Sequence, residues 1–275
     1  AALAQAQGFE VTGCDLEPNN EFTTQFKKSQ LFRGHYPKHL DCNLEGCSVD
    51  ILAVTPAIYS LDPNNPELVA ARKNGIPVLT WQQFVGKYLT KAKFVIAICG
   101  THGKTTTTAM IAQILEDANL DPTVLLGAIN PKWRANYRIQ RQNTHGRGYF
   151  VIEADEFNDN FLHLKPDIAV VTNIEMDHPE YFKDFESYKE SFKKFLLQTK
   201  KTAVANLSDS NVAEVIKIIM KTPNIQKGHG RSQNVYYLDY SKNELKFPLK
   251  IPGDFNKLNA QAALQVGLLL GLNPD

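Results

Sequence analysis

The sequence predicts an α/β protein made of two consecutive units, each built around a doubly wound, mostly parallel sheet. Short apolar runs rich in β-branched residues alternate with helical patterns along the 275 residues, which is the βαβ rhythm of such sheets. One of these runs enters a helix through the glycine-bearing stretch "CGTHGKTTTT" at residues 99–108. Because parallel sheets bind ligands where their strands end, this loop is the first candidate for a functional site.

The first unit covers residues 1–91. Strands are predicted at residues 9–15 and 49–57, where apolar, β-branched runs end in turn residues. A helix follows, with Pro66 near its start and Gly75 as its stop, and a short strand comes directly after it. The chain starts at Ala1 inside a helix-like stretch, so we expect a fragment of a longer protein.

The second unit covers residues 92–272. Strands are predicted by further apolar runs at residues 94–98, 123–126, 149–154, 168–173, 203–206 and 235–239. Helices are predicted by apolar residues at helical spacing at residues 105–118, 185–199, 212–221 and 257–270. Residues 273–275 then read as the start of a further domain that the chain lacks.

Composition and charge exclude several classes of protein. Hydrophobic residues make up 43% and charged residues 21%, as in a soluble globular protein, and 30 Lys and Arg balance 29 Asp and Glu. We therefore expect no nucleic-acid partner and no membrane insertion. The spacing of the cysteines, Cys14, Cys42, Cys47 and Cys99, is not paired, so it predicts neither a zinc site nor a disulfide framework. We therefore expect a cytoplasmic location.

The stretch at residues 99–108 has the order of parts that a phosphate-binding loop needs. An apolar strand ends at Cys99, glycines follow at Gly100 and Gly103, and a helix opens at Lys104 and Thr105. Backbone N–H groups from Gly103 onward can point at phosphate oxygens, the lysine can reach the β- and γ-phosphates, and the threonine hydroxyl can bind Mg²⁺. The alternative is a threonine-rich helix cap without a ligand.

Two further strands end in acidic residues. The strand at 149–154 delivers Glu153, Asp155 and Glu156, and Mg²⁺ prefers such carboxylate ligands, although three acids at a strand end can also be a solvated loop. The strand at 168–173 is followed by Asp177 and His178. Because these strands belong to one predicted sheet, the residues predict a site for a triphosphate and two metal ions.

Several motifs resemble the Mur ligases of peptidoglycan synthesis. The stretches "GTHGKTTTT", "EADE", "TNIEMDH" and "GDFNKLNAQAA" occur in the order and spacing of that family. In the first unit, "VTGCD", "FRGHYPKHL", "AVTPAI" and "NNPELVAARKNGIPVLT" resemble its UDP-sugar-binding domain. The resemblance implies an incomplete Rossmann-like UDP-binding domain, then a P-loop-containing central ATPase domain, with the C-terminal domain absent.

The resemblance also implies roles for particular residues, with ATP and Mg²⁺ as cofactors. The implied catalytic residues are Lys104, Glu153 and His178, and the implied metal ligands are Thr105, Glu153 and His178. ATP binding falls to the loop and to the segment near the adenine, that is, to Gly100, Thr101, His102, Gly103, Lys104, Thr105, Thr106, Asn256 and Asn259. Binding of the second substrate falls to Asp15, His35, Thr55, His102, Asp155 and Glu156.

Three features depart from the family pattern or stay open. The family usually has histidine where this chain has Phe255, so we expect stacking on the adenine there. Some relatives bridge their metals with a carbamylated lysine, for which Lys189 and Lys193 are both candidates. The stretch at residues 130–148 is unusually basic, and no role for it follows from the sequence.

The activity that the resemblance implies is an ADP-forming amide ligation through an acyl phosphate. The closest motifs are those of members that join L-alanine to the lactyl carboxylate of UDP-N-acetylmuramate, as a monomer or homodimer. A sister ligase that attaches a whole tripeptide to the same UDP-sugar is one alternative. Folylpolyglutamate synthases lack the UDP-binding unit, and the last alternative is a non-catalytic module that binds ATP and UDP-sugar.

Overall fold

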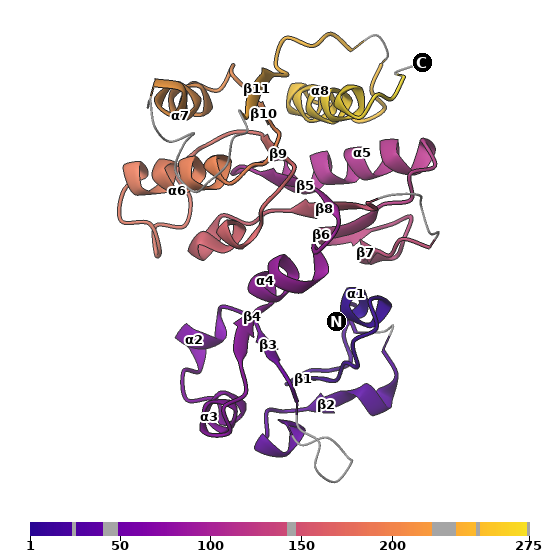
Figure 1. Ribbon diagram of the computed structural model, residues 1–275, viewed down its shortest axis with the longest axis vertical. Coiled ribbons are helices and arrows are strands. Elements are labelled where there is room, and N and C mark those ends of the chain that lie inside the picture. The colour runs from indigo at the N-terminus through magenta and orange to yellow at the C-terminus, as the bar shows by residue number, and fades with distance from the viewer. Residues whose placement is uncertain (24–25, 41–48, 142–146, 222–234, 246–247, 274–275) are drawn as a thin grey trace. The chain divides into compact units, whose positions relative to one another are not determined.

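The computed structural model describes residues 1–23, 26–40, 49–141, 147–221, 235–245 and 248–273 (Figure 1). Cys42, Cys47, part of the basic stretch and the last two residues therefore lie outside the described residues. The chain divides into two compact units, Ala1–Lys91 and Ala92–Asp275, which are described separately below. Among the described residues, no helix combines the length and the apolar character needed to cross a membrane.

The first unit contains two short parallel strand pairs. Strand β1 (Gly13–Asp15) pairs with β2 (Leu31–Arg33), and β3 (Leu52–Val54) pairs with β4 (Val78–Thr80). The predicted strands at 9–15 and 49–57 are thus three residues long each, and the described residues form two separate pairs in place of one doubly wound sheet. Every residue of β1, β2 and β3 is at least partly exposed, so these strands lack the two covered faces of a buried parallel sheet.

The helices of the first unit are short, and α3 (Pro66–Lys73) has the clearest signals in the sequence. The Asn65 side chain caps its first turn, Pro66 occupies its first position, and Gly75 follows its end with a positive φ. Its inner face contributes to a small core of Leu40, Ala71 and Ile76. The other helical segments are α1 (Ala2–Ala6), η1 (Lys28–Gln30), η2 (Pro37–Leu40), α2 (Ile58–Leu61), α4 (Trp81–Phe84) and η3 (Val85–Leu89).

The second unit is built on a seven-stranded sheet with the order β11-β10-β9-β5-β8-β6-β7. All neighbouring strands are parallel except β6 and β7, which form an antiparallel edge. The strands are β5 (Phe94–Cys99), β6 (Thr123–Asn130), β7 (Ala135–Arg138), β8 (Tyr149–Glu153), β9 (Ile168–Val171), β10 (Thr202–Ala205) and β11 (Tyr236–Asp239). Strand β5 is central, and the chain passes from β8 on one side of it to β9 on the other, so the carboxyl ends of these three strands adjoin.

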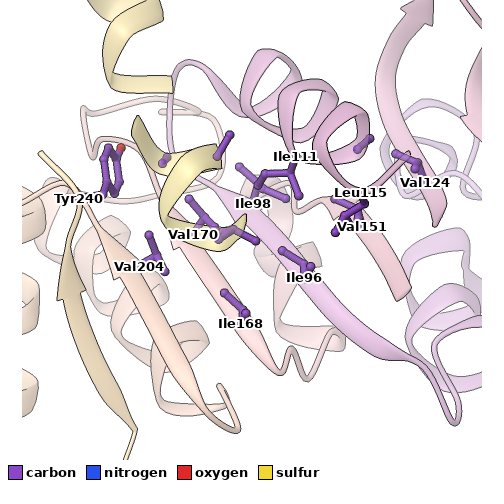
Figure 2. Packing of buried hydrophobic residues seen from close by; sticks show 14 of the residues in the cluster. Ile96, Ile98, Ile111, Leu115, Val124, Val151, Ile168, Val170, Val204 and Tyr240 are labelled. Atoms are coloured by element: carbon purple, nitrogen blue, oxygen red, sulfur yellow. The ribbon is translucent and has the colours of Figure 1, made fainter. Parts of the chain in front are cut away.

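Helices α5 (Lys104–Asp117) and α8 (Asp254–Leu269) pack against each other (Figure 1). Their apolar sides meet one face of the sheet in a core whose labelled members in Figure 2 are Ile96, Ile98, Ile111, Leu115, Val124, Val151, Ile168, Val170, Val204 and Tyr240. The alternate residues of β5, Val95 and Ala97, point to the other face and are also buried. Both faces of the central strand are therefore covered, which holds the strand ends rigidly.

The remaining helices are α6 (Phe185–Leu197) and α7 (Ser210–Lys221), which pack against each other, and η4 (Phe157–His163), which contacts α6. Phe161 of η4 stacks on Phe195 of α6 with ring centroids 4.6 Å apart. The cap of α6 is a side chain: Asp184 accepts a hydrogen bond from the Ser187 N–H. The predicted helices of this unit are all present, with ends that differ by up to three residues.

The basic stretch at 130–148 is mostly an edge hairpin with paired charges. It contains the turn after β6 and the strand β7, which the sequence did not predict. Arg138 pairs with Asp121 at 2.5 Å and with Glu116 at 3.4 Å, and Lys132 also pairs with Glu116. Arg147 pairs with the buried Asp167. Lys132, Arg138 and Arg147 thus pair with acids of the same unit.

Candidate functional site

The loop between β5 and α5 needs glycine at two positions. Gly100 has φ +129°, and a Cβ added there would lie 2.0 Å from the Thr172 hydroxyl. Gly103 has φ +82°, and a Cβ there would lie 2.5 Å from Oδ1 of Asn259. Other residues rarely adopt such φ values, and both sites lack room for a side chain. The backbone can therefore turn tightly at the strand end and enter α5 at Lys104.

The first turn of α5 is open toward a ligand. Gly103 occupies the N-cap position, and no side chain of the described residues caps the helix there. Helix α5 has 14 residues, so its dipole and the first N–H groups favour an anion at this end. The Thr106 N–H belongs to this turn, as expected for a phosphate-binding loop.

The end of β9 holds the loop in place. The Thr172 hydroxyl donates to the His102 carbonyl at 2.6 Å. Asn173 contacts the same residue twice: its Oδ1 accepts from the His102 N–H at 2.8 Å, and its Nδ2 donates to the His102 carbonyl at 3.1 Å. The imidazole of His102 is itself 69% exposed, so the backbone is fixed while the ring is available to a ligand.

Lys104 is held by a buried carboxylate. Its ammonium donates to Glu156 at 2.9 Å and to the Gly100 carbonyl at 2.6 Å. The Glu156 side chain is fully buried, and this burial raises the pKa of its carboxyl group while the Lys104 charge opposes the rise. The Tyr188 hydroxyl donates to the same carboxylate at 3.3 Å. Glu156 was expected to bind substrate, and the structure instead buries it beside the loop lysine.

Thr105 and Glu153 lie together, as the metal-site hypothesis requires. The Thr105 hydroxyl donates to Oε2 of Glu153 at 2.8 Å, and the Gly127 N–H donates to the same oxygen at 2.8 Å. A Cβ at Gly127 would lie 2.9 Å from this carboxylate, so a larger residue there would require the Glu153 side chain to shift. A hydroxyl and a carboxylate beside a phosphate loop are the oxygen ligands that Mg²⁺ prefers, so the donor set fits this ion.

His178 belongs to a second group of possible metal ligands with Glu156 and Asp177. One ligand atom from each residue lies within 4.8 Å of the others. His178 has φ +55°, its imidazole packs on Phe157 with ring centroids 4.8 Å apart, and its Nδ1 lies 3.3 Å from Glu180. A non-glycine residue with positive φ is uncommon, and such conformations concentrate at functional sites.

Asn256 and Asn259 are buried beneath the loop. The Thr107 hydroxyl donates to Oδ1 of Asn259 at 3.2 Å, and Asn259 donates to Oδ1 of Asn256 at 3.3 Å. Asn256 in turn donates to the Pro252 carbonyl. The two residues thus connect the start of α8 to α5, whereas Phe255, directly before Asn256, is 68% exposed and free to stack on a flat ligand.

Two other expectations concern charged residues farther along the chain. Asp155 accepts hydrogen bonds from the Phe157 N–H and from Nδ2 of Asn160, so its carboxylate orders the start of η4.

The two candidates for carbamylation are both paired with acids. Lys189 pairs with Glu186 and Glu214, and Lys193 pairs with Glu190. The hydrogen bond from Lys189 to Glu186, followed by that to Glu214, raises the pKa of Lys189. Because carbamylation needs a neutral amine, these contacts disfavour it at Lys189.

In the first unit, the three expected ligand residues lie at or just after the ends of strands. Asp15 is the last residue of β1, His35 comes two residues after β2, and Thr55 comes directly after β3. Asp15 Oδ1 accepts from the Glu17 N–H, and Asp15 and Thr55 are exposed. Carboxyl ends of parallel strands are where α/β proteins bind ligands.

Sequence reasoning missed several residues that shape the loop. Tyr188 lies on the apolar side of α6, and its hydroxyl is 3.1 Å from the Thr101 hydroxyl, which also donates to the Glu175 carbonyl. A tyrosine within an apolar helical pattern gives no sign of such a role. Asn173 is the last residue of the predicted strand at 168–173, so its position was a usable signal.

The fold and the site define an α/β protein with a loop of the phosphate-binding kind at the carboxyl edge of the seven-stranded sheet in its second unit. Two family models match the chain: the Mur ligase middle domain at residues 98–267, and the catalytic domain of the Mur ligase family at residues 1–93. The first alone covers more than half of the chain. The protein belongs to the Mur ligase family, whose members are ATP-dependent amino acid ligases.

Similar proteins of known function are UDP-N-acetylmuramate–L-alanine ligases. The protein from Caldicellulosiruptor saccharolyticus is 35% identical over 294 residues, which cover 100% of this chain and 61% of that protein. The one from Clostridium perfringens is 30% identical over 292 residues, covering 100% of this chain and 61% of that protein. The chain therefore spans about three fifths of the length of these relatives.

Solved structures give the same fold. UDP-N-acetylmuramate–alanine ligase from Thermotoga maritima matches with a TM-score of 0.75 and 26% identity, over 99% of this chain and 62% of that one. The UDP-N-acetylmuramate:L-alanyl-γ-D-glutamyl-meso-diaminopimelate ligase from Neisseria meningitides matches with a TM-score of 0.74 and 24% identity, over 99% of this chain and 89% of that one. The expected α/β architecture of a Mur ligase is thereby confirmed.

Proposed function

We propose that the whole protein joins L-alanine to the lactyl carboxylate of UDP-N-acetylmuramate with conversion of ATP to ADP. The observation that carries this proposal is the convergence of the open phosphate loop, the Thr105–Glu153 pair and the group of Glu156, Asp177 and His178 at one edge of one sheet. The similar proteins named above act on this UDP-sugar. The proposal locates the reaction in the cytoplasm.

In this proposal the chain's own residues position and neutralise charge. The N–H groups at the start of α5 bind the β- and γ-phosphates, and Lys104 turns from Glu156 toward the γ-phosphate. The γ-phosphoryl group passes to the lactyl carboxylate, and the amine of L-alanine then displaces phosphate from the acyl phosphate. Such transfer asks little covalent work of side chains, so orientation and electrostatic stabilisation are the protein's share.

Two groups of residues are proposed to hold Mg²⁺. Thr105 and Glu153 form one group, and His178 with Glu156 and Asp177 forms the other. Glu156 is thus proposed to bind the metal, whereas the sequence resemblance implied that it binds substrate. When bound, the ions neutralise charge on the phosphate oxygens. A cation held there would pair with the buried Glu156 carboxylate when Lys104 turns to the γ-phosphate.

The remaining ligand contacts are proposed from the strand ends and exposed side chains. Asp15, His35 and Thr55 bind the UDP-sugar in the first unit. His102 and Asp155 face the muramoyl carboxylate, and Phe255 stacks on the adenine while Asn256 and Asn259 support the loop from below.

The substitution Lys104→Ala in the full-length protein tests this proposal. We expect a loss of acyl-phosphate formation of at least about a hundredfold, because no other described cation lies in hydrogen-bonding contact with Glu156, and UDP-N-acetylmuramate binding should be retained. Phosphate release is measured with and without UDP-N-acetylmuramate. Lys132→Ala is the matched control, since Lys132 pairs with Glu116 on the edge hairpin. Undiminished turnover in Lys104→Ala would contradict the proposal.

The acceptor is identified by comparing the two candidate amine substrates in separate assays. L-alanine and the tripeptide L-alanyl-γ-D-glutamyl-meso-diaminopimelate are supplied separately to the full-length protein with ATP and UDP-N-acetylmuramate, and kcat/KM is compared. We expect L-alanine to be preferred, and preference for the tripeptide would assign the sister reaction. Binding of ATP and UDP-N-acetylmuramate without turnover of either acceptor would leave a binding module.

A further inference from the structure

The first unit contains a group of side chains of which only His35 is also proposed above to contact the UDP-sugar. The group consists of Cys14 in β1, His35 after β2 and Glu67 in the first turn of α3. His35 is 21 positions and Glu67 is 53 positions from Cys14 in the sequence, and the fold brings them together. One ligand atom from each lies within 4.8 Å of the others. The spacing of the cysteines predicted no zinc site because none of these three donors is near another in sequence.

The donor atoms lie slightly closer together than the ligands of a tetrahedral metal ion. Cys14 Sγ lies 3.2 Å from His35 Nδ1 and 3.0 Å from Glu67 Oε2, and His35 Nδ1 lies 3.5 Å from Glu67 Oε2. A tetrahedral zinc site with bonds of about 2.0–2.3 Å separates its ligand atoms by about 3.3–3.6 Å. Shifts of a few tenths of an ångström would therefore suffice to admit an ion.

The two oxygens of Glu67 have different surroundings. Oε1 accepts from the Tyr36 N–H at 3.2 Å, lies 2.7 Å from His39 Nδ1 and is 3.2 Å from Cys14 Sγ, whereas Oε2 lies closer to Cys14, at 3.0 Å, and 3.5 Å from His35. His39 is fixed in turn by stacking on Phe32, with ring centroids 4.7 Å apart. Metal-binding carboxylates are commonly oriented by such outer hydrogen bonds.

We propose that Cys14, His35 and Glu67 bind one zinc-class divalent cation, with His39 as a positioning residue and the fourth coordination position open. A thiolate and an imidazole favour Zn²⁺ or Co²⁺ over Mg²⁺. The thiolate and the carboxylate together balance the charge of the cation.

Binding exchanges a proton for the cation. The Cys14 thiol donates a hydrogen bond to Glu67, so the sulfur carries its proton before an ion binds. The sulfur–metal bond forms as the S–H bond breaks, and the proton leaves to the buffer. Apparent affinity should therefore rise as pH increases, with one proton released for each ion bound.

The test is titration of the whole chain with Co²⁺, followed by displacement with Zn²⁺. We expect one equivalent of Co²⁺ to produce a thiolate-to-cobalt charge-transfer absorption, and calorimetry in two buffers of different ionisation enthalpy to show release of one proton. Cys14→Ser keeps a donor to Glu67 and should abolish the absorption. His39→Asn should weaken binding about 10- to 100-fold while keeping it.

The matched control replaces the other thiols that lie outside the described residues. A variant with Cys42→Ser and Cys47→Ser should retain the absorption and the stoichiometry. Loss of the signal in that variant, or its persistence in Cys14→Ser, would overturn the proposal. So would the absence of stoichiometric binding in the unmodified chain, which would leave the group as a hydrogen-bonded cluster. None of these readouts depends on ligase turnover.

Discussion

Glu156 is the residue whose environment differs most from what its sequence position suggests. It was one of three acids at a strand end, yet its carboxylate is fully buried between Lys104 and Tyr188. Burial raises its pKa even though the lysine stabilises the charged form. A carboxylate in this state costs stability without a cation beside it, which makes the position suited to a site that binds one.

The pH dependence of stability tests this environment. The unfolded chain loses the Glu156 proton near the ordinary glutamate pKa of about 4.3, whereas the folded protein loses it at a higher pH. Over that interval the folded state holds more protons, so the contribution of Glu156 to the free energy of unfolding falls as pH rises. Glu156→Gln cannot ionise, so we expect the melting temperature of this variant, relative to the unmodified chain, to increase with pH.

Thermal unfolding from about pH 4 to pH 7 measures this difference. Glu190→Gln is the control, because Glu190 pairs with Lys193 on α6 and should leave the difference nearly constant. A melting-temperature difference for Glu156→Gln that falls as pH rises would mean that the Glu156 pKa is lowered in the folded protein.

At the scale of elements, the contact between α5 and α8 fixes the geometry of the phosphate loop. Asn259 of α8 reaches both Thr107 of α5 and the space beside Gly103. The sequence predicted both helices and placed their apolar residues correctly, because the 3.6-residue pattern is local. It did not predict that polar residues of α8 would be buried against the loop, since that depends on how two distant helices pack.

Two glycine substitutions should act in opposite directions. Gly103→Ala places a side chain at φ +82° and 2.5 Å from Asn259, so we expect it to lower the free energy of unfolding by more than about 1 kcal/mol and to weaken ATP binding. Gly267→Ala lies within α8, where a Cβ would meet only Ile114 at 3.4 Å. Alanine is the better helix former, so this control should raise stability by up to about 1 kcal/mol.

Denaturant unfolding gives both free energies, and titration with a non-hydrolysable ATP analogue gives the affinities. If Gly103→Ala were as stable as the unmodified chain and bound the analogue normally, the close approach of α8 to the loop would not matter for either property.

The edge of the large sheet shows what strand patterns alone leave open. Strand β7 lies in a stretch of mixed polar and basic residues, so it lacks the apolar run that identified the other strands. Its pairing with β6 and the ion pairs of Arg138 stabilise it. In the first unit the sequence instead predicted too much strand, because its apolar runs are longer than the paired strands that form.

At the scale of the whole molecule, two units carry separate candidate sites. The phosphate loop and both magnesium groups belong to Ala92–Asp275, and the strand ends with Asp15, His35 and Thr55 belong to Ala1–Lys91. Each ligand should therefore stabilise its own unit. At a free concentration of about 100 times Kd, one bound ligand adds about 2.7 kcal/mol.

Hydrogen exchange with each ligand tests this division. We expect the ATP analogue with Mg²⁺ to slow exchange most at the amides of the loop and first turn of α5, residues 100–106, and UDP-N-acetylmuramate to slow it after β1, β2 and β3. Omitting Mg²⁺ should reduce only the first effect. Protection by the ATP analogue confined to the first unit would contradict the placement of the nucleotide.

Local patterns were enough to determine much of this protein. The strand–glycine–helix order at Lys104 specifies a phosphate loop because helix N-termini bind anions whatever surrounds them. The α/β class follows from the alternation of buried strands and amphipathic helices, and the family follows from motifs that the family models match. Each of these features depends on residues that are close together in the chain.

Only the tertiary structure decided which distant side chains meet. It paired Lys104 with Glu156, Thr105 with Glu153, and His102 with Asn173, and it assembled Cys14, His35 and Glu67 from three separate elements. Their partners depend on strand order and helix packing, which no local pattern encodes. The reason is physical: burial and close approach set the charge and hydrogen bonding of a side chain, and both arise only when the chain is folded.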